Sequence, residues 1–266
     1  MRNKPKLTQA KYHVFILLSS LLSLMPTPSY AQIAHIMDRT NGNMKEGISS
    51  KVEVSLEKKS GNTETERIIA DGGIYFKQDK NLYMLLAKRD FGKLKSVIAA
   101  DSRFLHARYR RTMTDLFDWE FFTQVDTDEI KRREKRSLIG TGPRLKLLSS
   151  DRQHLTLGVA PMLEQEIYTK RSGLDTPDSA VKTRASVSNS YELKIIEPFA
   201  MQLSAYYQPN IESAADYRLS LKSALNIQVL TNLSVKVTVE QNTDSMPPEG
   251  AKKTDTVVKQ SFVFNW

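Results

Sequence analysis

The chain ends with the stretch Lys259-Gln260-Ser261-Phe262-Val263-Phe264-Asn265-Trp266. In an extended strand, Phe262, Phe264 and Trp266 lie on one face, and the residues between them lie on the other. Three bare aromatic side chains gain nothing at the end of a soluble domain, where the backbone frays. In the closing strand of a transmembrane β-barrel, the same side chains contact hydrocarbon and the headgroup region. The alternation therefore predicts a membrane β-strand.

This ending is similar to the C-terminal sorting signature of bacterial outer-membrane proteins, in which alternating hydrophobic residues end on Phe or Trp. Ser261 stands where that signature prefers glycine, which is a mild departure. The similarity implies that the chain is delivered to the outer membrane, with the barrel-assembly machinery as a transient partner.

Residues 1–31 have the pattern of a secretory signal peptide. A positively charged region precedes an apolar run over residues 14–25, which is too short to span a bilayer comfortably as a helix. The small-x-small sequence that ends at Ala31 predicts cleavage before Gln32. We therefore expect export by the secretion machinery, a periplasmic lead-in over residues 32–47 and an outer-membrane barrel over residues 48–266.

The composition excludes several other classes of protein. The formal net charge is +9, and four of the positive charges belong to the predicted signal peptide. The remaining excess is too small to favour nucleic acid as a partner. The chain has no cysteine, so disulfides do not stabilise it. After the signal peptide no apolar run is long enough for a membrane-spanning helix, and we expect no cofactor.

Period-two alternation recurs through the rest of the chain. The clearest example is Leu233, Val235, Val237 and Val239, which alternate with polar residues. We predict an all-β fold, a transmembrane antiparallel up-and-down β-barrel of about twelve strands, each long enough for a tilted membrane crossing. The predicted strands lie near residues 48–58, 64–77, 81–89, 95–109, 116–126, 136–148, 153–168, 183–196, 200–208, 216–229, 233–242 and 255–266.

The connections between these segments alternate in length. Tight turns are expected at residues 78–80, 149–152, 197–199 and 230–232, and longer loops at 127–135, 169–182, 209–215 and 243–254. Short periplasmic turns and longer outer loops are typical of outer-membrane barrels. A secreted β-sandwich or jelly roll is the alternative, but it has no physical reason to keep this rhythm.

Several segments resemble the salt-induced outer-membrane protein family, the YdiY-like barrels grouped under a domain of unknown function. The matching segments are Ser60-Gly61-Asn62-Thr63, residues 119–124 with 138–144, and residues 247–256. Their order and spacing cover nearly the whole chain after the signal peptide. The resemblance implies a barrel in the outer membrane and implies no settled activity.

A lipid-modifying enzyme of the phospholipase or lipid A deacylase type is the alternative function. Such enzymes need a serine next to a histidine that a third polar group orients. Past the signal peptide the chain has only His35, His106 and His154, and the last two fall on the predicted lumen side. We therefore expect no enzymatic activity. Asp126, Asp128 and Glu129 resemble a fragment of a calcium loop, but they lack its glycine and its final glutamate, so no metal site is predicted.

A basic run over residues 131–136 begins in the predicted outer loop at residues 127–135, and we expect it to face outward. Guanidinium groups match phosphate oxygens, so this run could contact lipopolysaccharide. An ordinary solvated loop is the simpler interpretation, and it is the one that we favour. The candidate contact residues are Lys131, Arg132, Arg133, Lys135 and Arg136.

The lumen side of the strands carries charges of both signs. Opposite charges on neighbouring strands can pair and fill a narrow lumen, whereas a selective channel favours a ring of one sign. We therefore expect a narrow or closed barrel with an envelope or stress role, either structural or a narrow channel for small polar solutes, with lipid and lipopolysaccharide as surroundings. The predicted lumen-facing residues are Arg144, Lys146, Glu164, Glu166, Glu192, Lys194, Arg218, Lys222, Lys236, Glu240 and Lys259.

Overall fold

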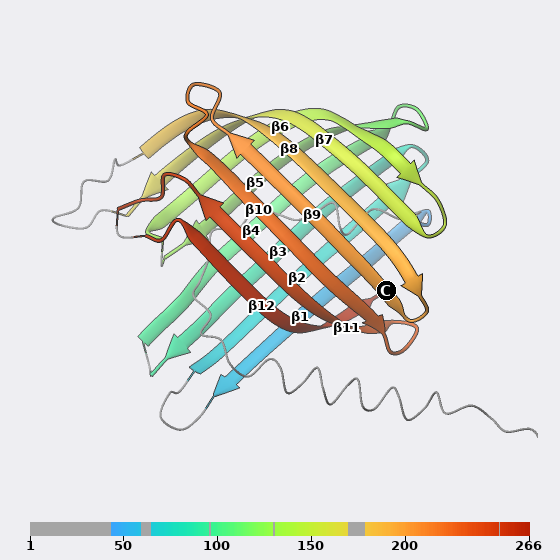
Figure 1. Cartoon of the computed structure of the whole chain (residues 1–266), viewed down its shortest axis with the longest axis horizontal. Helices are drawn as coiled ribbons and strands as arrows, with labels where there is room; N and C mark the ends of the chain where they lie inside the picture. The colour runs from blue at the N-terminus through green and yellow to red at the C-terminus, as the bar shows by residue number, and fades with distance from the viewer. Residues whose placement is uncertain (1–43, 60–64, 96, 130, 170–178, 250) are drawn as a thin grey trace, which may run out of the picture.

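The chain folds into a closed antiparallel barrel of twelve strands (Figure 1). The computed structural model describes residues 44–59, 65–95, 97–129, 131–169, 179–249 and 251–266. The predicted signal peptide, its cleavage site and most of the lead-in lie outside these residues. Among the described residues, no helix is long and apolar enough to cross a membrane. The predicted all-β class and the number of strands are confirmed.

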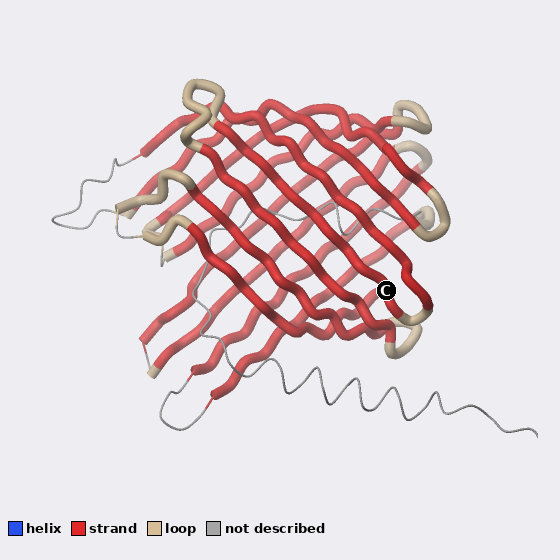
Figure 2. The backbone as a smooth tube through the Cα atoms, in the orientation of Figure 1, coloured by secondary structure: helices blue, strands red, loops and turns tan. Residues whose placement is uncertain are grey.

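The strands are long and follow one another around the barrel. Each is hydrogen-bonded to its neighbours in sequence, and β1 closes the ring against β12 (Figure 2). Their bounds are β1 Gly47–Lys59, β2 Thr65–Gln78, β3 Asn81–Leu94, β4 Val97–Thr112, β5 Phe117–Asp128, β6 Arg133–Ser149, β7 Gln153–Tyr168, β8 Ser179–Ile196, β9 Phe199–Pro209, β10 Tyr217–Gln228, β11 Leu233–Asp244 and β12 Thr254–Asn265.

The barrel has two different ends. The connections after β2, β4, β6, β8 and β10 lie at one end, on the right in Figure 1, and we call it the turn end. The odd-numbered strands end, and the even-numbered strands begin, at the other end, which we call the loop end. β1 starts and β12 finishes at the turn end.

The wall has the inverse polarity of a soluble protein. Large apolar side chains point outward, including Ile48 (78% exposed), Phe262 (50%) and Trp266 (63%). Buried side chains are mostly polar or charged. The outer face also carries a row of rings across β2 to β5, Phe76, Tyr83, Tyr109 and Phe121, with successive centroids 6.0, 5.1 and 6.3 Å apart.

Two predicted connections are wrong because their turns carry no glycine or asparagine signal. In the loop expected at residues 127–135, β5 runs on to Asp128 and β6 already begins at Arg133; β3 runs on to Leu94 instead of ending near residue 89. The residues with positive φ in these tight turns are Arg132 (55°) and Lys95 (47°). Non-glycine residues adopt this conformation rarely, so a sequence pattern does not mark such a turn.

The weak alternation around residues 82–100 also has a structural cause. Leu82, Met84 and Leu86 of β3 point into the lumen, where they pack with Tyr75. The outward face of the same strand carries Tyr83 and Leu85, so both faces are apolar. A strand that is apolar on both faces loses the period-two signal. The lumen therefore contains one apolar cluster among its charged groups.

The seam between the first and last strands is short. Its register runs from Lys51 opposite Asn265 to Val54 opposite Phe262. Ser50 and Trp266 add two backbone hydrogen bonds of 2.9 Å. Ser55 still contacts Ser261, with 3.1 Å between their hydroxyl oxygens. Farther on, β1 continues beside β2, β12 continues beside β11, and the two strands diverge toward the loop end (Figure 1).

Candidate functional site in the barrel lumen

A carboxylate at the loop end binds three arginines from three other strands. Glu164 of β7 is fully buried and accepts hydrogen bonds from Arg136 of β6 (2.8 Å), Arg184 of β8 (3.0 Å) and Arg218 of β10. Arg218 also donates to both oxygens of Glu166 at 2.8 Å. Because Arg218 lies three strands away from Glu164 in the sheet order, this contact crosses the lumen rather than following the wall.

These residues belong to a larger group that we call the Glu164 network. Its further ion pairs include Arg133 with Asp126 (2.7 Å) and Arg184 with Asp216 (2.8 Å). The network contains as many cations as carboxylates. Its members are Arg133, Arg136, Lys182, Arg184 and Arg218 on one side, and Asp126, Glu164, Glu166, Asp216 and Asp244 on the other.

Asp216 precedes β10 in the loop and is held as a carboxylate. Burial alone would raise its pKa, but hydrogen bonds from Lys182 (2.7 Å) and Arg184 (2.8 Å) outweigh that effect. The pKa of Asp216 therefore lies below its ordinary value. These contacts link β8 to the loop that precedes β10 at the loop end.

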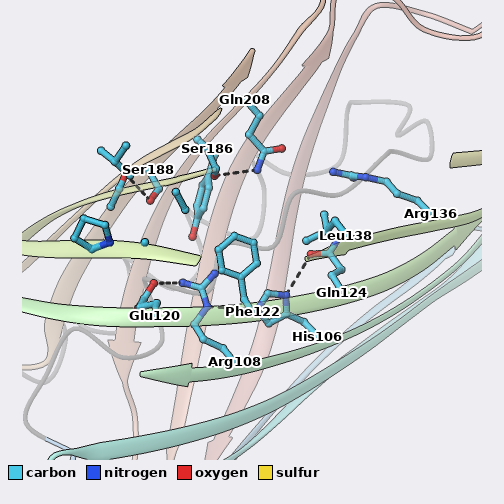
Figure 3. A pocket seen from close by; sticks show the side chains of 16 residues that line it. His106, Arg108, Glu120, Phe122, Gln124, Arg136, Leu138, Ser186, Ser188 and Gln208 are labelled. Atoms are coloured by element: carbon cyan, nitrogen blue, oxygen red, sulfur yellow. Dashed lines mark hydrogen bonds and ion pairs between the residues drawn. The ribbon is translucent and has the colours of Figure 1, made fainter. Parts of the chain in front are cut away.

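The middle of the lumen holds a line of polar contacts around His106 (Figure 3). Arg108 donates to Glu120 at 2.5 Å and to Nε2 of His106 at 3.4 Å. Nδ1 of His106 lies 3.3 Å from the side-chain oxygen of Gln124. The adjoining cavity has a volume of about 30 Å³, which holds roughly one or two waters. Side chains therefore occupy most of this level of the barrel.

His106 has the surroundings of a structural residue. Its ring stacks between Phe104 (centroids 6.0 Å apart) and Phe122 (6.1 Å), and the guanidinium of Arg108 lies 4.8 Å from the Phe122 ring. His154 lies elsewhere, on the lining of a cavity at the turn end. The structure thus does not bring the two histidines together.

The described residues hold no group of three or more His, Asp or Glu side chains that could bind a metal ion. Asp126, from the suspected calcium-loop fragment, pairs with Arg133 and also lies 3.8 Å from Arg136. Asp128 accepts a hydrogen bond from the backbone of Lys131 at 3.1 Å. These two aspartates therefore face cationic and amide groups.

A second ionic group lies at the turn end, and we call it the turn-end cluster. Glu120 accepts hydrogen bonds from Arg108 (2.5 Å) and Arg110 (2.6 Å). Asp118 pairs with Lys146 (2.7 Å) and Arg144 (3.3 Å). The cluster borders an open cavity of about 380 Å³, which we call the vestibule.

A third group lies behind the seam. Glu53 of β1 pairs with Lys236 of β11 at 2.7 Å and with Lys259 of β12 at 3.1 Å. Lys222 and Glu240 are opposite each other in the register of β10 and β11. These contacts link β1 to β11 and β12 from inside the barrel.

The structure brings most of the predicted lumen residues into these groups. Two of the predicted lumen residues, Glu192 and Lys194, lie outside these groups. Glu192 is half-buried near the turn end, and Lys194 is exposed at the rim, where the register of β8 and β9 shifts. The residues placed in the three groups are Arg144, Lys146, Glu164, Glu166, Arg218, Lys222, Lys236, Glu240 and Lys259.

The prediction that the basic run faces outward in a loop is wrong for most of its residues. Because β6 begins at Arg133, Arg133 and Arg136 belong to a strand and point inward, where Asp126 and Glu164 bind them. Arg132 is also buried, and Lys131 pairs with Asp255 at 2.8 Å. Lys135 is the one candidate contact in this run that is exposed.

Several lumen residues were missed from the sequence. Asp118 and Glu120 alternate with the outward aromatic residues Trp119 and Phe121, and this alternation is the signal that could have identified them. Glu53 follows the same rule between Val52 and Val54.

A family model described as "Protein of unknown function, DUF481" matches residues 52–266. No curated protein matches the sequence. Among solved structures, the chain is similar to the translocator domain of the autotransporter NalP from Neisseria meningitidis, with 9% identity, a TM-score of 0.47 and coverage of 97% of both chains. It is also similar to the NanC porin, with 8% identity, a TM-score of 0.46 and coverage of 82% of this chain and 98% of that chain.

Proposed function

The chain belongs to the DUF481 family of unknown function, and on that premise we propose that it is a non-enzymatic outer-membrane β-barrel with a narrow, ion-paired lumen. In this role it serves the cell envelope as a structural or stress-related barrel and passes at most small polar solutes. The salt-induced, YdiY-like character that the sequence resembles fits this role and is part of the proposal.

Support for the membrane location comes from the polarity of the wall. Large apolar side chains are exposed around the outside of the barrel. Such a surface is unfavourable in water but is favourable in contact with the hydrocarbon core of a membrane. The row from Phe76 to Phe121 suits an interfacial aromatic girdle. A closed sheet also leaves few backbone groups unpaired, which a bilayer core demands.

The Glu164 network is the observation that carries the proposal for a narrow lumen. Arg218 reaches Glu164 from three strands away, and Arg136 and Arg184 reach it from the two neighbouring strands. Long side chains of both signs therefore occupy the cross-section at the loop end. Equal numbers of both charges do not form the single-sign ring that an ion-selective pore uses.

Contact with lipopolysaccharide stays a proposal for Lys135, because it is the exposed cation of the basic run. The other proposed partners are the surrounding lipid and, transiently, the export and barrel-assembly machinery. No nucleic acid is proposed.

Planar-bilayer conductance tests the narrow lumen. We expect the wild-type protein to give very small or no current steps. Glu164→Gln leaves three arginines around a neutral group, so their repulsion should widen the lumen, produce larger steps and favour anions. Lys252→Gln, an exposed loop residue, removes one charge elsewhere and should leave the conductance unchanged.

Large, stable steps from the wild-type protein would contradict the narrow lumen. The location is tested separately by fractionation of cells and by gel mobility with and without boiling. Recovery of the mature protein in the soluble periplasmic fraction would contradict the membrane location.

A further inference from the structure

The vestibule at the turn end is large enough to hold a small solute. Its volume of about 380 Å³ falls in the range of ligand pockets. Arg110, Arg144 and Lys146 line it together with Asp118. Thr112, Ser149 and Thr156 add hydroxyl groups.

The turn-end cluster carries more positive than negative charge. Arg108 and Arg110 share Glu120, while Arg144 and Lys146 share Asp118. Of these residues, Arg110, Arg144, Lys146 and Asp118 line the vestibule, whereas Arg108 and Glu120 line the smaller cavity beside His106. The remaining charged residues that line the vestibule, Lys77, Lys80, Asp79 and Asp115, cancel one another.

The Glu164 network, at the opposite end of the same lumen, shows that this excess is not general. There, five cations meet five carboxylates. Of these two groups, the one at the turn end therefore carries the more positive net charge. A cavity with low-dielectric walls and one sign of charge concentrates ions of the opposite sign.

The chemistry of the cluster selects the kind of anion. Guanidinium groups bind carboxylate and phosphate oxygens through paired hydrogen bonds, and the ammonium of Lys146 supplies a point charge. Asp118 and Glu120 are nearly fully buried, so they hold the arginines in place while Lys146 stays partly open to the vestibule.

We infer that the vestibule is a binding site for a small soluble anion carrying phosphate or carboxylate groups. The anion supplies the negative charge that the turn-end cluster lacks and lies against Arg110, Arg144 and Lys146. This inference deepens the proposed function, on which it rests, by naming the class of polar solute.

Calorimetric titration of the purified protein in nonionic detergent tests the inference without any membrane or conductance. The probes are inorganic phosphate and succinate at constant ionic strength, with chloride as the reference. We expect saturable binding of at least one probe. Lys146→Gln should weaken it at least fivefold, and Asp118→Asn, which increases the charge excess, should strengthen it.

Lys252→Gln is the matched control, because it removes the same charge from an exposed position on the loop side. Gel mobility with and without boiling shows whether each variant is folded. The absence of saturable binding, or equal binding by folded Lys146→Gln, would overturn the inference.

A third arm separates a soluble anion from a lipid headgroup. If micelles containing phosphatidylglycerol bind in a Lys146-dependent way while both soluble probes fail, the site takes a headgroup phosphate and the soluble-anion inference is wrong. A large wild-type conductance with normal anion binding would contradict only the proposed narrow lumen.

Discussion

Glu53 and Lys236 are separated by 183 positions in the sequence, yet Nζ of Lys236 donates a 2.7 Å hydrogen bond to Oε2 of Glu53 inside the barrel. β12 lies between their strands, so the ion pair spans the seam from within. Lys259 of β12 reaches the other oxygen of the same carboxylate at 3.1 Å. One carboxylate therefore connects three strands where the backbone register is shortest.

Replacement of Glu53 by Gln should destabilise the barrel. The buried ammonium of Lys236 and the partly buried one of Lys259 would lose the charge of Glu53, and breaking a buried ion pair in this way costs about 3 kcal/mol. Urea unfolding in detergent measures the change, with exposed Lys252→Gln as the control. The double variant Glu53→Gln with Lys236→Gln should recover part of the loss. Equal stability of Glu53→Gln and the wild type would contradict a stabilising role for this pair.

A disulfide across the seam should lock the barrel. The hydroxyl oxygens of Ser55 and Ser261 are 3.1 Å apart, which brings the two side chains within reach of a disulfide. Because the chain has no cysteine, Ser55→Cys with Ser261→Cys would form one defined cross-link. We expect the oxidised form to unfold at a higher temperature than the reduced form, with a gain of about 2 to 4 kcal/mol. Failure of the folded double variant to oxidise would show that the seam is open at this position.

Gly142→Ala should disrupt the pairing of β6 with β7. A Cβ at Gly142 would lie 2.1 Å from the carbonyl oxygen of Val159 and 2.8 Å from Cα of Ala160, so backbone atoms must move. Overpacking of this kind costs about 2 kcal/mol or more. Gly72→Ala is the matched control, because its nearest contact would be 3.8 Å. Thermal unfolding should show a clear loss for Gly142→Ala and little change for Gly72→Ala.

Asp216 should make stability depend on pH in the acid range. Its pKa is lower in the folded state than in the unfolded chain, so its contribution is complete above the ordinary value of 3.8 and is lost as the pH falls through the lowered value. Asp216→Asn removes that contribution at every pH. The stability difference between wild type and variant should therefore be constant near neutral pH and shrink toward strongly acidic pH. A difference that grows on acidification would have the wrong sign.

Strand identity and strand phase could be predicted because they depend on neighbours along the chain. The alternation around Val235 and Lys236 assigns each side chain to a face without knowledge of the other strands. The same local rule assigned Phe262 and Trp266 to the outer wall. It failed where a strand is apolar on both faces, as at Leu82 and Tyr83, and where a tight turn lacks a sequence marker, as at Arg132.

The sequence by itself thus determined the barrel, its approximate strand number and the side of the wall on which most residues lie. The tertiary structure alone decided which charged side chains form ion pairs. Inside the lumen, some of these pairs join residues that are far apart in the sequence and lie on strands that are not neighbours. Arg218 reaches Glu164 from three strands away, and Lys236 reaches Glu53 across the closing strand. Closure and stagger of the sheet set these distances. As a result, the Glu164 network at the loop end is balanced in charge, and the vestibule at the turn end is lined by more cations than carboxylates.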